Sequence, residues 1–91
     1  MTVVLLGKPD CHLCHVMEDI VAPVLAARGI ALDVRDVRAD PETLRRYRND
    51  IPVLLVDGVE IARHRITGDE LNLRLQQLKT SHRDTETQRT E

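Results

Sequence analysis

The spacing of the apolar residues changes sharply along the first part of this chain. Residues 3–6 are consecutive apolar side chains ended by Gly7, a run typical of a strand buried on both faces. From residue 13 to residue 25 the apolar positions recur every three or four residues, which predicts an amphipathic helix that ends near Gly29. Residues 30–35 alternate in the manner of a strand with one exposed face. Because a helix separates these two strands, they are expected to pair in parallel.

Turn and capping residues predict the remaining elements. Residues 40–42, Asp-Pro-Glu, form a good helix start, and residues 53–56 are a second continuous apolar strand. Asp57-Gly58 predicts a hairpin returning into residues 59–62, and Thr67 with Glu70 forms a capping-box pair before a last helix. The predicted order is β-α-β-α-β-β-α. We therefore expect an α/β fold with a mixed sheet of about four strands flanked by about three helices.

The last residues differ in composition from the rest of the chain. Residues 79–91 contain no apolar side chain. A segment with nothing to bury cannot offset the entropy lost on folding. We expect a single domain over residues 1–78 and a polar, disordered tail over residues 79–91.

Charge and aromatic content exclude several classes of partner. Lys and Arg number 13 against 15 Asp and Glu, for a net charge of −2, and Tyr47 is the only aromatic residue. Neither a cationic field nor stacking side chains are available, so nucleic acid is not expected as a partner. No apolar stretch approaches the roughly 18 residues of a membrane span, and no signal-peptide core is evident. A cytoplasmic protein without a membrane partner is expected.

Cys11 and Cys14 lie where the first predicted strand meets the first predicted helix. Free N–H groups and the dipole at a helix N-terminus stabilise a thiolate, which suits Cys11 as a nucleophile and Cys14 as a resolving thiol. Lys8 and His12 add positive charge nearby.

Three other interpretations fit the same residues. Cys11, Cys14 and a histidine could hold a metal ion, although a structural zinc site usually needs a second pair of ligands. Residues 11–15 also match C-x-x-C-H, the pattern of covalent haem attachment. However, the sequence shows no export signal and no aromatic residues to line a haem pocket at this site. Finally, both cysteines could be buried structural residues.

Several segments together resemble the small glutaredoxin-like proteins of the thioredoxin fold. They are residues 7–14 (Gly-Lys-Pro-Asp-Cys-His-Leu-Cys), Asp40-Pro41, residues 50–54 (Asp-Ile-Pro-Val-Leu) and Asp57-Gly58. The resemblance spans about residues 2–78. It implies a thioredoxin-like fold, a cis peptide bond at Pro52, and a backbone at Ile51 that binds an extended peptide or glutathione.

The same resemblance implies further site residues and some departures. Lys8 matches the family lysine that pairs with a glutathione carboxylate. His12-Leu13 stand where glutaredoxins usually have Pro-Tyr, and the Gly-Gly pair that binds the other end of glutathione is absent after Ile61.

The sequence thus predicts a thiol-disulfide oxidoreductase with Cys11 as nucleophile, Cys14 as resolving cysteine, and Lys8, His12, Ile51 and Pro52 as substrate-binding residues. Its partners would be a disulfide-containing protein or glutathione, with a reductase or glutathione as electron donor. We expect a monomer with no bound metal and no tightly bound cofactor, and glutathione is a candidate co-substrate. The alternative is a non-catalytic thioredoxin-fold module that binds a metal or a partner through the Cys/His face.

Overall fold

The computed structural model describes residues 1–88, with side chains described for residues 1–78. Its elements follow the predicted order, with one addition between the second strand and the second helix. They are β1 (Val3–Gly7), α1 (His12–Ala27), β2 (Leu32–Asp36), the 3-10 helix η1 (Val37–Ala39), α2 (Pro41–Tyr47), β3 (Val53–Val56), β4 (Val59–Arg63) and α3 (Gly68–Gln88).

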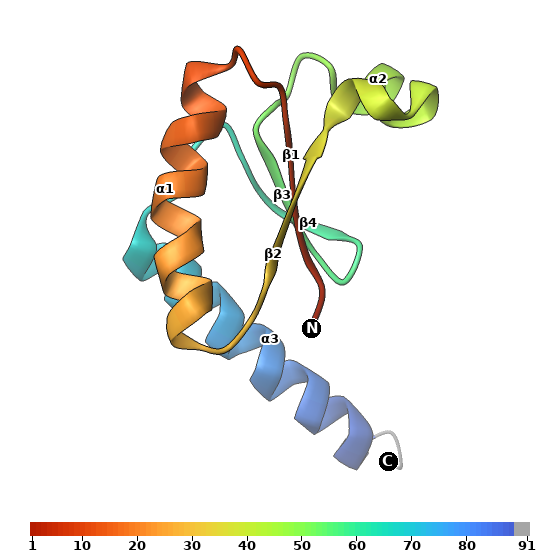
Figure 1. Cartoon of the computed structure of the whole chain (residues 1–91). Helices are drawn as coiled ribbons and strands as arrows, with labels where there is room; N and C mark the ends of the chain where they lie inside the picture. The colour runs from red at the N-terminus through yellow and green to blue at the C-terminus, as the bar shows by residue number, and fades with distance from the viewer. Residues whose placement is uncertain (89–91) are drawn as a thin grey trace.

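The four strands form one mixed sheet in the order β2-β1-β3-β4. β1 pairs in parallel with β2, as a crossover through α1 requires, and in antiparallel with β3. β3 and β4 form the hairpin that Asp57-Gly58 predicts, and both turn residues have positive φ, 51° and 83°. β1 therefore lies inside the sheet, and β2 and β4 are its edges (Figure 1).

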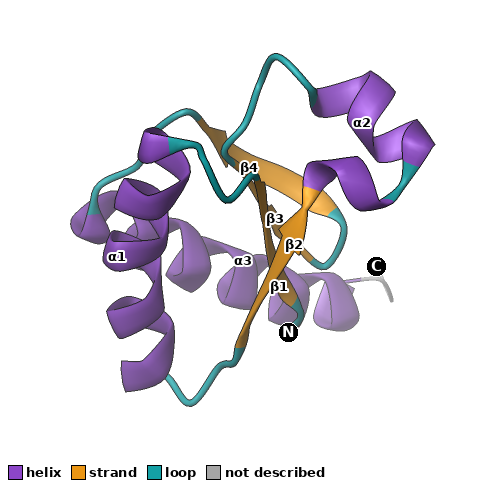
Figure 2. Cartoon of the chain, turned by 45° about the horizontal axis from the view of Figure 1, so that its top comes forward, coloured by secondary structure: helices purple, strands orange, loops and turns teal. Residues whose placement is uncertain are grey.

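Helices α1 and α3 pack against the same face of the sheet (Figure 2). The core between them is aliphatic and draws on both helices and on three strands: Val3, Leu5, Met17, Val21, Leu25, Leu54, Val56, Ile61, Ile66, Leu71 and Leu75. Leu71 and Leu75, one helical turn apart, are both completely buried. The predicted α/β architecture, a mixed four-stranded sheet flanked by three helices, is confirmed.

The short helix α2 lies near the end of the sheet at which β1 and β2 finish (Figure 1). Its N-cap is Asp40, whose side chain accepts hydrogen bonds from the backbone N–H and the hydroxyl of Thr43. Before it, the Asp36 side chain caps η1 by accepting from the Arg38 N–H at 2.8 Å. Sequence analysis missed η1, which buries Val37 completely.

The last helix differs from the predicted disorder of the C-terminal segment. α3 continues past residue 78 to Gln88, where a disordered tail was expected. Residues 79–88 contain neither glycine nor proline and several good helix formers, so the helix has no local signal to stop. Residues 89–91 of the predicted tail lie outside the described residues. None of the described helices is both long enough and apolar enough to cross a membrane.

Candidate active site

Cys11 occupies the N-cap of α1, directly after the loop that follows β1. Its backbone is extended (φ −100°, ψ 111°), and its sulfur accepts a hydrogen bond from the Cys14 N–H at 3.2 Å. This is the contact by which an N-cap side chain satisfies a free donor of the first helical turn. Cys11 and Cys14 are 5.2 Å apart at Cα and form a disulfide, so the structure shows the oxidised pair.

The two cysteines differ in exposure. Cys11 is half-buried, whereas Cys14 is buried with 6% of its surface exposed. A Cβ placed on Gly7 would lie only 2.7 Å from the Cys14 sulfur, so the end of β1 passes directly beside Cys14. The more accessible Cys11 suits the attacking role and the enclosed Cys14 suits the resolving role.

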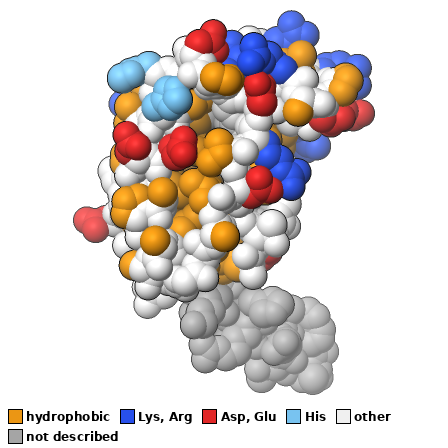
Figure 3. Space-filling model, in the orientation of Figure 1, with side chains coloured by type: hydrophobic (Ala, Val, Ile, Leu, Met, Phe, Trp, Pro, Cys, Tyr) orange, Lys and Arg blue, Asp and Glu red, His pale blue; other side chains and the backbone are white. Residues whose placement is uncertain are grey.

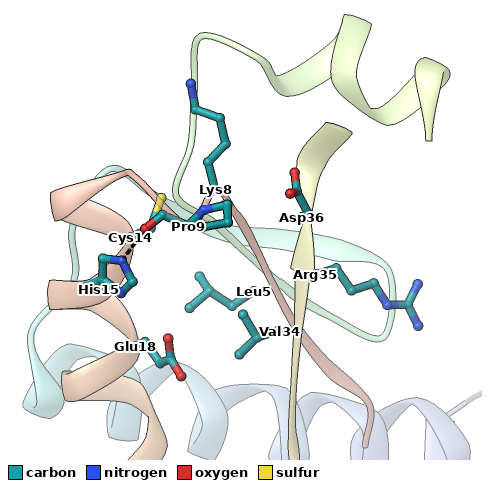
Figure 4. Close-up of a pocket in the computed structure, with 10 residues that line it drawn as sticks. Leu5, Lys8, Pro9, Cys14, His15, Glu18, Val34, Arg35 and Asp36 are labelled. Carbon is teal, nitrogen blue, oxygen red and sulfur yellow. Dashed lines mark hydrogen bonds between the residues drawn. The ribbon is translucent and has the colours of Figure 1, made fainter. Parts of the chain in front are cut away.

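The loop that carries Cys11 is held at two points. The Cys11 N–H donates to the Lys8 carbonyl at 3.2 Å. His15 Nε2 donates to the Pro9 carbonyl at 2.7 Å (Figure 4). His15 is exposed and lies one turn into α1, so its ring ties the loop to the helix. This contact of His15 was not predicted from the sequence.

The Ile51–Pro52 peptide bond is cis, as the family resemblance implies. Pro52 is buried directly before β3, and its carbonyl accepts a hydrogen bond from the His64 N–H at 2.8 Å. His64 has a φ of 72°, a conformation that few non-glycine residues adopt. The segment after β4 thus holds the loop before β3. The predicted substrate-binding roles of Ile51 and Pro52 stay predictions.

Lys8 and His12 flank the pair. His12 is exposed at the first position of α1, and Lys8 is half-buried after the end of β1. Figure 4 shows the Lys8 side chain extending away from Leu5 and Val34. Their predicted contacts with substrate also stay predictions.

A cleft of about 130 Å³ lies on the inner side of the disulfide, between α1 and the strands β1 and β2. The Cys14 side chain forms part of its wall (Figure 4). Its floor is aliphatic, from Leu5 and Val34, and Glu18 on α1 and Asp36 on β2 stand at its rim. This cleft was not predicted from the sequence. Val34 is uncovered because β2 is an edge strand, and no local sequence pattern shows which strands lie at the edges of a sheet.

Ion pairs surround the site without entering it. Two hydrogen bonds from the Arg38 side chain and one from its backbone lower the pKa of Asp36 from 3.8 to about 2. Arg63 forms ion pairs with Asp50 at 3.2 Å and with Glu60. Hydrogen bonding to Arg63 lowers the pKa of the Glu60 carboxyl.

The described part of the chain offers no cluster of three or more His, Cys, Asp or Glu side chains placed to hold a metal ion. The disulfide also engages both thiols that such a site would use. The metal-binding interpretation gains no geometric support from these residues.

Comparisons with known proteins agree with this geometry. A family model described as a glutaredoxin-like domain matches residues 2–76. Among solved structures, target protein XcR50 from X. campestris is 27% identical, with a TM-score of 0.63, over 82% of this chain and 96% of its own. Thioredoxin 1 from Thermosipho africanus is 20% identical, with a TM-score of 0.63, over 90% and 99%.

The glutaredoxin-like protein NrdH-redoxin from Escherichia coli is 20% identical, with a TM-score of 0.51, over 71% of this chain and 86% of its own. The last two likenesses concern the fold. No curated protein matches the chain.

Proposed function

The chain belongs to the glutaredoxin-like family, and from that membership we propose that it is a thiol-disulfide oxidoreductase that reduces protein disulfides or glutathione mixed disulfides. The observation that carries the proposal is the disulfide between Cys11, at the N-cap of α1, and the buried Cys14. A catalytic dithiol must pass through this oxidised state in every cycle.

In the reduced protein, the free N–H groups at the start of α1 stabilise Cys11 as a thiolate. The thiolate attacks one sulfur of the substrate disulfide and forms a mixed disulfide, while the other substrate sulfur leaves as a thiolate. Cys14 then loses its proton and attacks the Cys11 sulfur, which releases the second substrate thiolate. Two electrons have passed to the substrate, and the protein is left with the Cys11–Cys14 disulfide.

The loop before β3 is the proposed docking edge for substrate. Ile51 is half-buried and directly precedes the cis bond, and the His64 N–H donates a hydrogen bond to the Pro52 carbonyl. Lys8 and His12 supply positive charge beside the disulfide for an anionic group such as a glutathione carboxylate. We place the reaction in the cytoplasm, with a reductase or glutathione returning the electrons.

A redox titration tests this proposal directly. The reduced protein is equilibrated with graded mixtures of reduced and oxidised glutathione, quenched with an alkylating agent and weighed by mass spectrometry. We expect an intramolecular Cys11–Cys14 disulfide with a defined midpoint. A stable glutathione adduct on Cys11 would indicate a monothiol route, and two thiols that stay reduced throughout would contradict the oxidoreductase and favour the binding module.

Two serine variants assign the roles within the pair. Cys11→Ser should abolish disulfide reductase activity, because the attacking sulfur is gone. Cys14→Ser is the matched control, since it keeps Cys11 and should accumulate mixed disulfides that a denaturing, non-reducing gel reveals. Full activity of the Cys11→Ser variant would contradict the mechanism.

A further inference from the structure

The outer edge of β2 has the features of a surface that pairs with another strand. β2 lies at the edge of the sheet, and no described segment pairs with its outer side. The inner residues of the strand, from Asp33 to Arg35, are all exposed, and the strand contains neither proline nor a bulge. Its two exposed charges, Asp33 and Arg35, have opposite signs, so they oppose strand pairing only where like charges face each other. Natural proteins usually protect an edge strand with proline, a bulge or charged side chains, because the free N–H and C=O groups of the edge can pair with another chain.

The opposite edge of the sheet is protected. The pairing of β4 with β3 is irregular at Leu54/Leu55, and Arg74 on α3 donates a hydrogen bond to the Ile61 carbonyl of β4. A bulge and a side chain that occupies a strand carbonyl both discourage strand addition. Of the two edges, that of β2 has neither of these two devices among the described residues.

The side chains of β2 are complementary to a second copy of the same strand. Asp33 and Arg35 lie on one face of the sheet and flank Val34, which lies on the other face and is 50% exposed. Figure 4 shows Val34 directed toward Leu5 in the cleft and Arg35 directed away from it. If two β2 strands pair in antiparallel about a two-fold axis at Val34, Asp33 of each copy faces Arg35 of the other and the two valines face each other.

Within one chain, Asp33 and Arg35 already form an exposed ion pair at 2.7 Å. Pairing would bring two such ion pairs together into one network of four alternating charges. Opposite charges directly across an antiparallel pair stabilise it, and like charges destabilise it.

The face occupied by Val34 supplies the apolar part of the contact. Figure 3 shows hydrophobic side chains gathered in the hollow between α1 and β2, with charged side chains on either side. In the paired sheet the two β1 strands would lie three strand spacings apart, about 14 Å. The two α1 helices then lie on the same face of the continuous sheet, with the two Val34 side chains between them. Counting by four from Glu18, which lines the cleft, leads to Ala22 and Ala26, which are both exposed and add little bulk on this side of α1.

We propose that this protein forms a symmetric homodimer through antiparallel pairing of β2 with β2 of a second copy, centred on Val34. The two sheets become one continuous sheet, and the two clefts face each other between the α1 helices. The proposal does not depend on the redox chemistry, although Cys14 and Lys8 line the clefts that the dimer brings together. It replaces the monomer expected from the sequence.

Sedimentation equilibrium of the full chain, from micromolar to millimolar concentration, tests the dimer. Excess reductant is present, so that intermolecular disulfides do not contribute. We expect a reversible monomer–dimer equilibrium, with slower hydrogen exchange of β2 amides as the concentration rises. A chain that stays monomeric over the whole range overturns the proposal.

Charge variants test the register. Asp33→Arg places like charges across the axis twice and should raise the dimer dissociation constant by about tenfold or more. The double variant Asp33→Arg with Arg35→Asp restores opposite charges across the axis and should restore the dimer. Asp69→Arg, an equal charge change at the start of α3, should leave the constant unchanged, and circular dichroism verifies that each variant folds. A dimer that Asp33→Arg does not weaken uses another face and overturns the proposal.

Discussion

At the scale of single residues, the active site depends on a glycine that has no chemical role. Gly7 ends β1, and a Cβ there would lie 2.7 Å from the Cys14 sulfur and 2.9 Å from the Cys14 Cβ. Real Cβ atoms do not approach neighbours so closely, and Cys14 cannot move freely because the disulfide ties it to Cys11. We expect Gly7→Ala to lower the free energy of unfolding of the oxidised protein by about 1–3 kcal/mol, the usual cost of overpacking. Urea unfolding measures it.

The matched control for this prediction is Gly68→Ala at the start of α3. A Cβ on Gly68 would lie 3.8 Å from the Val24 side chain, which is an ordinary contact. Because alanine restricts the unfolded chain and favours helix, this variant should be neutral or stabilising by up to about 1 kcal/mol. If both variants unfold alike, the close approach of β1 to Cys14 has no energetic importance.

Asp36 makes the stability of the protein depend on pH in the acid range. Hydrogen bonds from Arg38 hold its pKa at about 2 in the folded protein, against an ordinary aspartate pKa of 3.8. Since the folded pKa is the lower one, the contribution is complete above pH 3.8 and is lost as the pH falls toward 2. We expect Asp36→Asn to flatten the decline in unfolding free energy over this interval, as measured by urea unfolding at a series of pH values.

Arg38→Gln removes the two side-chain hydrogen bonds to Asp36 but keeps the one from the backbone, so it should flatten the same interval in part. The Asp36 side chain is 35% exposed and that of Arg38 52%, so water screens the ion pair and its effect on stability is small, and the shape of the pH profile matters more than its height. A profile for Asp36→Asn that parallels the wild type between pH 3.8 and 2 would contradict the assignment.

At the scale of elements, α2 depends on its N-cap more than on burial. None of its residues is buried, and Asp40 accepts hydrogen bonds from the Thr43 N–H at 3.1 Å and from the Thr43 hydroxyl at 2.8 Å. We expect Asp40→Ala to lower the unfolding free energy by about 1 kcal/mol, as loss of an N-cap does. Asp40→Asn keeps a capping oxygen without the charge and should retain most of the stability. An equal loss in both variants would mean that charge, and not capping, supports α2.

The same elements show how far sequence alone predicts the fold. Asp40-Pro41, Asp57-Gly58 and Thr67 act through contacts within a few residues, so their effects were predictable and are confirmed. The 3-10 helix η1 was missed because it is a single turn without apolar periodicity. The Asp36 side chain caps η1 through a local hydrogen bond, and an aspartate at the end of a predicted strand does not by itself indicate such a cap.

Some features of the candidate site could be predicted from the sequence, and others could not. The position of Cys11 at a helix N-cap follows from where the apolar spacing changes, and the structure confirms it. The approach of Gly7 to Cys14, the positive φ of His64 and the cleft beside Val34 depend on how distant segments pack. No local pattern encodes such distances, so sequence analysis did not reach them.

At the scale of the whole molecule, the open question is where the folded unit ends. Sequence analysis placed its end at residue 78, whereas the backbone of α3 continues to Gln88. Every residue of the described core precedes residue 78, and Leu78 itself is the last apolar residue packed against that core. Residues 79–91 carry no apolar side chain, so their removal would expose little new apolar surface.

We therefore expect a chain ending at residue 78 to fold and to form the Cys11–Cys14 disulfide. Its free energy of unfolding should lie within about 0.5 kcal/mol of that of the full chain. Urea unfolding and the glutathione titration, run on both chains, measure this. The matched control is Leu75→Ala in the full chain, which empties a completely buried position and should cost about 2–5 kcal/mol. If truncation costs as much as Leu75→Ala, residues 79–91 make contacts that the fold requires, and the unit extends beyond residue 78.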